Sequence, residues 1–403
     1  MFERSRVINA LEVKRDRFSG YQGTVHERAR TLDGALEQMA FLSRAELEAR
    51  LKATNVARPG ALPTKEQDNV HAAVVKFDAD WHSHEEARKW AKQVLRDRPT
   101  FAVDGSQIPH SRDFSIPVAA IQIGWFENPH SPSQTYTKDL FFEVLTPDEL
   151  TTYEENTDTL DPTADVGAFP GILVNLRRFE GECHRMVTYM QERANCDPKP
   201  LCFFDGSLVL SFARHLSPQL RQGYLDSLVN MLRTSQATGV PLVGYVDTSY
   251  ARDLVTMLTL VSGLPTPAHL SDGVLLHSRM RWGDRSQLYW CARDDEVLQL
   301  YEEQVGRIAF AYLKTGTMSP PARVEFPGWV LEDQARVEHI FDLIRAECIV
   351  GNGYPYVLET ADAVAVISTE DRQRFYAIFQ QFAKKEGLAL CYSRKARSKA
   401  IRR

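Results

Sequence analysis

Two short apolar segments of this chain end in the same tripeptide, Asp-Gly-Ser, and they constrain the fold most. Residues 100–104 and 201–205 are each predicted to form a buried strand that ends in an Asp-Gly-Ser turn. Around them the sequence favours strands at 116–125, 136–145 and 241–247, and helices at 170–190 and 219–236. Three strands followed by helix, strand, helix and strand predict an α/β fold, a mixed sheet flanked by helices.

The two Asp-Gly-Ser turns also indicate a site. If their strands are parallel neighbours, about 4.8 Å apart, Asp104 and Asp205 meet at the sheet edge where α/β proteins bind ligands. Two carboxylates this close repel each other, and one takes up a proton unless a cation lies between them. Oxygen ligands without cysteine indicate Mg²⁺ or Mn²⁺, and a carboxylate-bound metal pair suits attack on a phosphodiester. An ordinary turn or helix cap is the alternative for each tripeptide.

Composition excludes several classes of protein. With 43% hydrophobic and 25% charged residues, the chain has the composition of a globular protein. It has no run of 18 apolar residues, and its first residues lack the apolar core of a signal peptide, so we expect a cytoplasmic protein without a membrane partner. The net charge of −5 argues against a general nucleic-acid binder. The six cysteines lack zinc-site spacing and are expected to be reduced.

Patterning along the chain predicts three parts. Residues 1–95 are polar with apolar residues at helical spacing, which predicts a helical arm that serves dimerisation or partner docking, or packs on the main domain. Residues 96–387 form the α/β domain. Residues 388–403 are a basic tail that either contacts phosphate or an acidic partner, or is a frayed, solubilising end. The acidic stretch 139–165 is predicted as a solvated loop.

Four motifs, taken in order, resemble those of the NurA nucleases, which process DNA ends with the HerA translocase. The resemblance covers roughly residues 98 to 385. Its motifs are Phe101-Ala-Val-Asp104-Gly-Ser, Phe203-Phe-Asp205-Gly-Ser-Leu208, Arg323-Val-Glu-Phe-Pro327 and Gly353-Tyr-Pro355 followed by Leu358, Ala361 and Asp362. It implies a ribonuclease-H-like core, in which the first and fourth strands are parallel neighbours.

The resemblance also implies an activity and partners. We expect Mn²⁺-dependent (or Mg²⁺-dependent) cleavage of DNA, 5′ to 3′ from ends and also within single strands. We expect a ring-shaped homodimer that stacks on a HerA-type hexameric ATPase in end resection and double-strand break repair. A catalytically weak, DNA-threading adaptor of the ATPase and a ribonuclease-H-like enzyme acting on RNA are the alternatives.

Carried over to this chain, the family's first two metal ligands are Asp104 and Asp205. The family has a further Glu on the helix before the second turn, and Glu180 and Glu182 are the candidates here. Glu180 lies nearer the centre of the helix's apolar stripe, so it is predicted as the ligand. Glu143 at the end of the third strand is a weaker candidate.

Near the C-terminus the family has Tyr-Pro followed by an Ala-His pair. Tyr354-Pro355 fits the first, and Tyr354 is expected to orient a phosphate or water. The second is Ala361-Asp362, so Asp362 stands where the family usually has a metal-binding His. The spacing from Tyr354 to Asp362 fits two helical turns, which would bring both to one side. A carboxylate can replace imidazole on Mn²⁺ or Mg²⁺; the change could equally mean a weakened site.

Two other groups have competing interpretations. Asp247 is predicted to cap a helix over 250–260, with a metal-ligand role as the alternative. Arg279, Arg281 and Arg285 with Trp282 form either a β-hairpin with exposed arginines or the lining of a single-strand channel.

Overall fold

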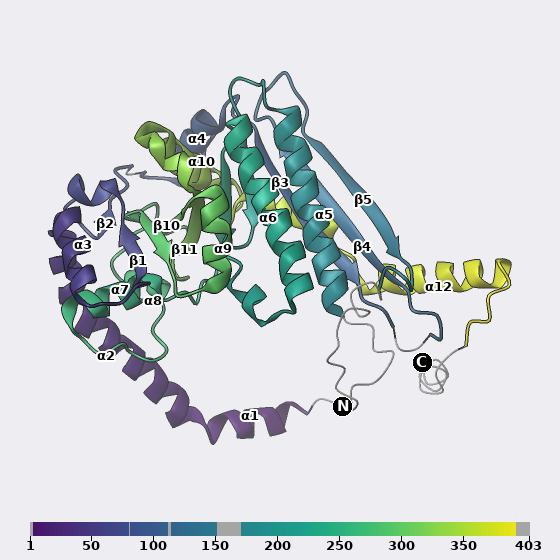
Figure 1. The fold of residues 1–403 in the computed structure, drawn as a ribbon, viewed down its shortest axis with the longest axis horizontal. Helices are drawn as coiled ribbons and strands as arrows, with labels where there is room; N and C mark the ends of the chain where they lie inside the picture. The colour runs from purple at the N-terminus through teal and green to yellow at the C-terminus, as the bar shows by residue number, and fades with distance from the viewer. Residues whose placement is uncertain (1–2, 80, 112–113, 151–170, 392–403) are drawn as a thin grey trace. The chain divides into compact units, whose positions relative to one another are not determined.

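The computed structural model describes residues 3–79, 81–111, 114–150 and 171–391 of the chain (Figure 1). The chain divides into two compact units. We call Met1–Asp80, Tyr245–Asp295 and Arg307–Gly328 the N-terminal unit. We call Trp81–Gly244, Glu296–Gly306 and Trp329–Arg403 the site unit.

The sheet of the site unit has the predicted ribonuclease-H-like arrangement. Its strands lie in the order β7-β6-β3-β4-β5. β3 runs antiparallel to β4, and β4 runs antiparallel to β5. β3 is parallel to β6, with Thr100 opposite Leu201 and Val103 opposite Phe204. The first and fourth strands are therefore parallel neighbours, as expected. The strands are β3 (Thr100–Ile108), β4 (Ala119–Asn128), β5 (Thr137–Leu145), β6 (Leu201–Asp205) and β7 (Leu242–Val246), whose last two residues belong to the N-terminal unit.

Helices cover both faces of this sheet. α5 (Gly171–Glu192) packs beside α6 (Pro218–Thr238) on one face, where Gly181 meets Ile123 of β4 (Figure 1). α11 (Tyr356–Ala365) lies on the other face, because Gly124, the neighbour of Ile123 in β4, points to it. The other helices of this unit are α4 (His84–Leu95), α9 (Glu296–Val305), α10 (Gln334–Val350) and α12 (Thr369–Lys385).

In the N-terminal unit the first series of helices ends at Ala53. Beyond it the chain adds β1, which pairs with β9 from Gly60↔Ala292 to Pro63↔Tyr289. Four strands of this unit lie in the order β1-β9-β10-β11, and β2 pairs with β8, which also pairs with β10. Its elements are α1 (Arg4–Glu12), α2 (Arg15–Ala40), α3 (Arg44–Ala53), β1 (Gly60–Pro63), β2 (Val74–Val75), α7 (Asp253–Ser262), α8 (Asp272–His277), β8 (Arg285–Ser286), β9 (Tyr289–Ala292), β10 (Ile308–Leu313) and β11 (Ala322–Pro327).

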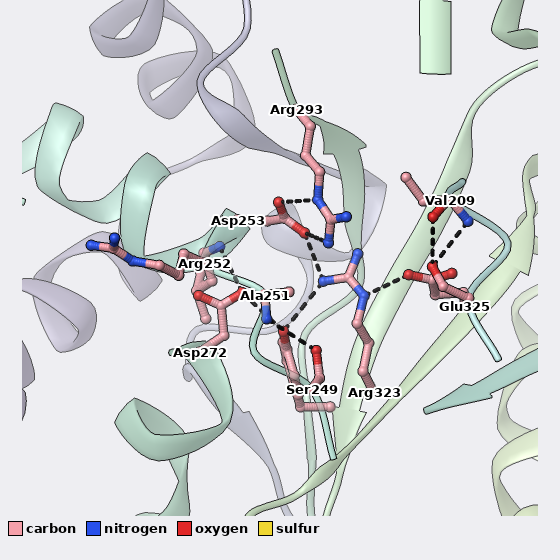
Figure 2. Close-up of polar contacts among 12 residues, drawn as sticks. Val209, Ser249, Ala251, Arg252, Asp253, Asp272, Arg293, Arg323 and Glu325 are labelled. Atoms are coloured by element: carbon pink, nitrogen blue, oxygen red, sulfur yellow. Dashed lines mark hydrogen bonds and ion pairs between the residues drawn. The ribbon is translucent and has the colours of Figure 1, made fainter. Parts of the chain in front are cut away.

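A buried charge network joins the elements of the N-terminal unit. Arg323 lies between Asp253 and Glu325, at 2.7 Å and 2.6 Å (Figure 2). Arg293 binds the same Asp253 with two nitrogens, at 2.6 Å and 2.8 Å. Asp272 accepts the Leu254 and Val255 amides at the start of α7, at 3.1 Å and 2.8 Å. The side chains in this network are buried: Arg323, Asp253, Asp272 and Glu325 are each at most 4% exposed. The network therefore stabilises the fold and is not accessible as a binding site.

No helix in the described part of the chain has the length and apolar character needed to cross a membrane.

Candidate active site

The candidate site lies where β6 ends. Asp205 is the last residue of β6, and Gly206 turns away from the sheet with φ +141°. The register that pairs Val103 with Phe204 places Asp104 level with Asp205. From Gly105 onward β3 has no β6 residue beside it, so side chains from both faces of the sheet can meet there.

The first Asp-Gly-Ser is not a turn, contrary to the prediction. β3 continues to Ile108 because β4 pairs with it throughout, Gly105 lying opposite Ile123. Gly105 is required for a different reason. A Cβ at this position would lie 2.4 Å from Glu182 Oε1 and 2.7 Å from Arg178 Cγ. The glycine therefore lets α5 bring a carboxylate close to the strand that carries Asp104.

A second glycine brings α11 to the opposite face. Gly124 is paired with Asp104, and a Cβ there would lie 2.6 Å from the Ala365 nitrogen. This close approach brings Asp362 of α11 near enough for its carboxyl group to raise the pKa of Asp104. The proximity therefore indicates a concentration of negative charge at this edge.

The acids of the site perturb one another. Burial raises the pKa of Asp104 to about 6, and Asp362 and Asp205 add to the increase. Burial likewise raises the pKa of Glu182 to about 7; the negative charges of Asp104 and Asp205 add to it, and Arg178 opposes it. Asp104, Asp205, Glu182 and Asp362 thus form one electrostatically connected group, which we call the acid cluster.

The helix acid that the structure brings to this cluster is Glu182 and not the predicted Glu180. The Glu182 side chain is 9% exposed and lies over Gly105. Glu180 instead pairs with Arg177 at 3.3 Å, and burial and the nearby Glu143 raise its pKa. No described contact joins Glu143 to the acid cluster.

The different placement of the two acids has a physical reason. α5 is buried on two sides, against the sheet and against α6. Glu180 faces α6, since a Cβ at Gly223 would lie 3.3 Å from its carboxylate oxygen. The sheet side is marked by Phe179, Glu182, Cys183 and Met186, spaced i, i+3, i+4 and i+7, all of which are buried. This spacing in the sequence could have identified Glu182.

The predicted helical position of Tyr354 is also wrong. α11 begins at Tyr356 after the N-cap Pro355, so Tyr354 lies in the preceding turn and not on the helix. Its amide donates to the Gly351 carbonyl at 3.4 Å. Asp362 reaches the acid cluster through α11 alone, and the role of Tyr354 stays a prediction.

The donor chemistry of the acid cluster fits a hard divalent cation, because all of its donors are carboxylate oxygens. The positions of the side chains, however, are not those of a metal-bound site. Across the described residues, no three His, Cys, Asp or Glu side chains are grouped so as to hold a metal ion. Glu182 is paired with Arg178 through its Oε1 atom. A cation that bound this oxygen would have to replace that contact.

Two arginines of the predicted single-strand channel form ion pairs within the protein instead. Arg285 is buried and bonds Glu66 with two nitrogens, at 2.5 Å and 3.1 Å. Arg279 pairs with Asp33 at 2.8 Å and with Glu37 at 3.0 Å. These two arginines therefore do not line a single-strand channel, and Arg285 is not an exposed hairpin residue either.

Asp247 is not the predicted helix cap. α7 begins at Asp253, and the carboxylate that accepts the amides of its first turn is Asp272, from a later segment of the chain (Figure 2). Residues 151–165 of the acidic stretch and residues 392–403 of the basic tail lie outside the described residues.

Comparison with known proteins gives one family and several solved structures. A family model described as "NurA domain" matches residues 98–367, well over half of the chain. The chain is similar to a NurA crystal structure with manganese at 12% identity, covering 71% of this chain and 89% of that one, with a TM-score of 0.40. No protein with curated function matches.

Two further solved structures are similar in part. One is NurA bound to dAMP and manganese, at 12% identity, covering 68% of this chain and 85% of that one, with a TM-score of 0.33. The other is the catalytic domain of human endonuclease V, at 14% identity, covering 84% and 94%, with a TM-score of 0.30. Because these TM-scores are all below 0.5, the family match and the geometry of the acid cluster are the stronger guides to function.

Proposed function

The chain belongs to the NurA family, and on that premise we propose that it is a metal-dependent nuclease that hydrolyses the phosphodiester backbone of DNA. Family membership supports the nuclease. The observation that carries the metal dependence is the acid cluster, in which four carboxylates from β3, β6, α5 and α11 act on one another's charge. Such a concentration of negative charge is best stabilised by a cation.

In this proposal Asp104, Asp205, Glu182 and Asp362 hold Mn²⁺ or Mg²⁺. When bound, the cation supplies an activated water and stabilises charge on the leaving oxygen. Asp104 and Asp205 come from neighbouring strands and form the fixed part of the site. Glu182 and Asp362 approach from opposite faces of the sheet. The lack of a side chain at Gly105 and Gly124 makes room for this close approach. Tyr354 orients a phosphate or a water.

The wider proposal follows the family resemblance. We extend it to 5′ to 3′ cleavage from DNA ends, cleavage within single strands, a homodimer, and action with a HerA-type hexameric ATPase in end resection and double-strand break repair. A basic tail at 388–403 and a helical arm are the segments available for docking. Deleting each in a pull-down with a HerA-type ATPase would distinguish them.

A catalytically weak adaptor of the ATPase is the second candidate. The observation that favours it is Asp362, which stands where the family usually has a metal-binding His. A carboxylate there adds negative charge to an already crowded site. The three remaining acids of the cluster argue for a working site.

The test is cleavage of end-labelled linear DNA in Mn²⁺, Mg²⁺ or EDTA, with and without a HerA-type ATPase. We expect metal-dependent cleavage that Asp104→Asn and Asp205→Asn abolish. Glu182→Gln should lower the rate by about 100-fold, whereas the matched variant Glu180→Gln should leave it nearly unchanged. DNA binding without cleavage under any metal would eliminate the nuclease and favour the adaptor.

A further inference from the structure

One charged neighbour of the acid cluster has no role in the proposed reaction. Arg178 lies on α5 one turn before Glu182 and pairs with the Glu182 Oε1 atom through Nη1. The same Nη1 lies 3.4 Å from the Gly105 carbonyl oxygen. Its aliphatic carbons lie over Gly105, where a Cβ would be 2.7 Å from Cγ and 3.2 Å from Cδ. Arg178 thus connects the helix acid with the strand of Asp104.

The two partners of this ion pair differ in their freedom to leave it. The Glu182 side chain is only 9% exposed and is held among the buried residues of α5, whereas the Arg178 side chain is 31% exposed. A guanidinium keeps its charge at every physiological pH. Arg178 can therefore move into solvent as a charged group, while Glu182 keeps its place and needs a cation beside it.

This pair occupies one carboxylate of the acid cluster. The described residues contain no set of three metal-binding side chains ready to hold an ion, and the Glu182 carboxylate is already engaged by Arg178. A divalent cation that bound the Glu182 Oε1 atom would displace the guanidinium, because Arg178 Nη1 holds the same oxygen.

We propose that Arg178 is an internal counter-cation of the acid cluster, which neutralises Glu182 and competes with the divalent metal for its carboxylate. This inference rests on the proposed function, since that function makes Glu182 a metal ligand. Arg178 is then a positioning residue that acts through Glu182. It stabilises the metal-free protein and lowers the affinity of the site for metal.

The test is calorimetric titration of Mn²⁺ into the full chain, without DNA. Removing the competing cation in Arg178→Met should tighten Mn²⁺ binding by about tenfold, and should lower the melting temperature in EDTA. Arg177→Met is the matched control, because Arg177 is the adjacent arginine of the same helix but pairs with Glu180. It should bind Mn²⁺ like the wild type. Arg178→Lys keeps a cation and should restore affinity towards that of the wild type.

A second pair of variants separates this role from a merely structural one. If Arg178 acts through Glu182, adding Arg178→Met to Glu182→Gln should leave Mn²⁺ affinity unchanged. Equal or weaker Mn²⁺ binding by a folded Arg178→Met protein would overturn the inference and leave the nuclease proposal intact. Wild type that binds no Mn²⁺ would overturn both. If Arg178→Met fails to fold, Arg178→Gln supplies the same neutral comparison.

Discussion

At the scale of single residues, glycines decide which side chains meet. Gly105 and Gly124 lie on neighbouring strands, and each faces a different covering helix. Neither has a positive φ, so neither is needed for backbone conformation. Gly124 is needed because the backbone of α11 lies too close for a side chain, and Gly105 because the side chains of Glu182 and Arg178 fill the space above it. The acid cluster depends on both.

We expect Gly105→Ala to lower the free energy of unfolding by about 1–2 kcal/mol, because the added methyl group overlaps Glu182 and Arg178. Metal affinity should fall with it, since Glu182 must shift. Urea unfolding and Mn²⁺ titration measure the two effects. Gly34→Ala is the control: this helical glycine of α2 has open space around it, and alanine there should stabilise the protein by about 0.5–1 kcal/mol. Destabilisation by both substitutions would argue against the steric explanation.

At the scale of elements, the backbone amides in the first turn of α7 are hydrogen-bonded to a residue that is distant in the sequence. Its N-cap, Arg252, offers no side-chain cap, and the carboxylate of Asp272 accepts the amides instead. Tyr312 donates to the same carboxylate at 2.9 Å. Burial, and then the charge of Asp253, raise the pKa of Asp272 to about 6. Helix α7 is therefore anchored by a residue whose charge is costly in the folded state.

This raised pKa predicts a pH dependence of stability. The unfolded chain releases the Asp272 proton near pH 3.9, while the folded chain holds it to about pH 6. The folded state thus binds more protons between these values, and this contribution to stability is lost as the pH rises. The stability of the wild type relative to Asp272→Asn should fall by about 2 kcal/mol from pH 4 to pH 7. Urea unfolding of both proteins measures it, and a difference that grows with pH would contradict the assignment.

At the scale of the whole molecule, the N-terminal helices α1 to α3 differ in how deeply their side chains are buried. None of the described residues of α1 is buried, and its exposed apolar residues include Ile8 and Leu11. Further along, Leu32 and Leu36 of α2 and Leu47 of α3 are buried in the core of the N-terminal unit. The arm is thus partly a surface segment and partly a structural component.

Removing residues 1–12 should change the melting temperature by less than about 2 °C, because no described side chain of α1 contributes to a core. Removing residues 1–53 should lower it strongly, because α2 and α3 supply buried leucines. Thermal unfolding of the two truncated proteins makes the comparison. A large loss of stability from the shorter deletion would show that α1 packs against the fold.

The local sequence was enough for the α/β class and for the strands that carry Asp104 and Asp205. Apolar runs of strand length and the order of strands and helices depend on neighbouring residues, so a single sequence shows them. The ranges predicted for the helices at 170–190 and 219–236 match α5 and α6 closely for the same reason. The family resemblance supplied the parallel pairing of the first and fourth strands.

Only the tertiary structure decided which helix acid joins the site. Glu180 and Glu182 lie on the same helix, and the choice depends on which buried side of α5 faces the sheet and which faces α6. It also decided that Arg178 accompanies Glu182 and that Asp272, not Asp247, anchors α7. The sequence determined which residues are apolar, acidic or small, because those properties are local. The structure determined which of them meet, because contacts between distant segments depend on how helices pack on a sheet.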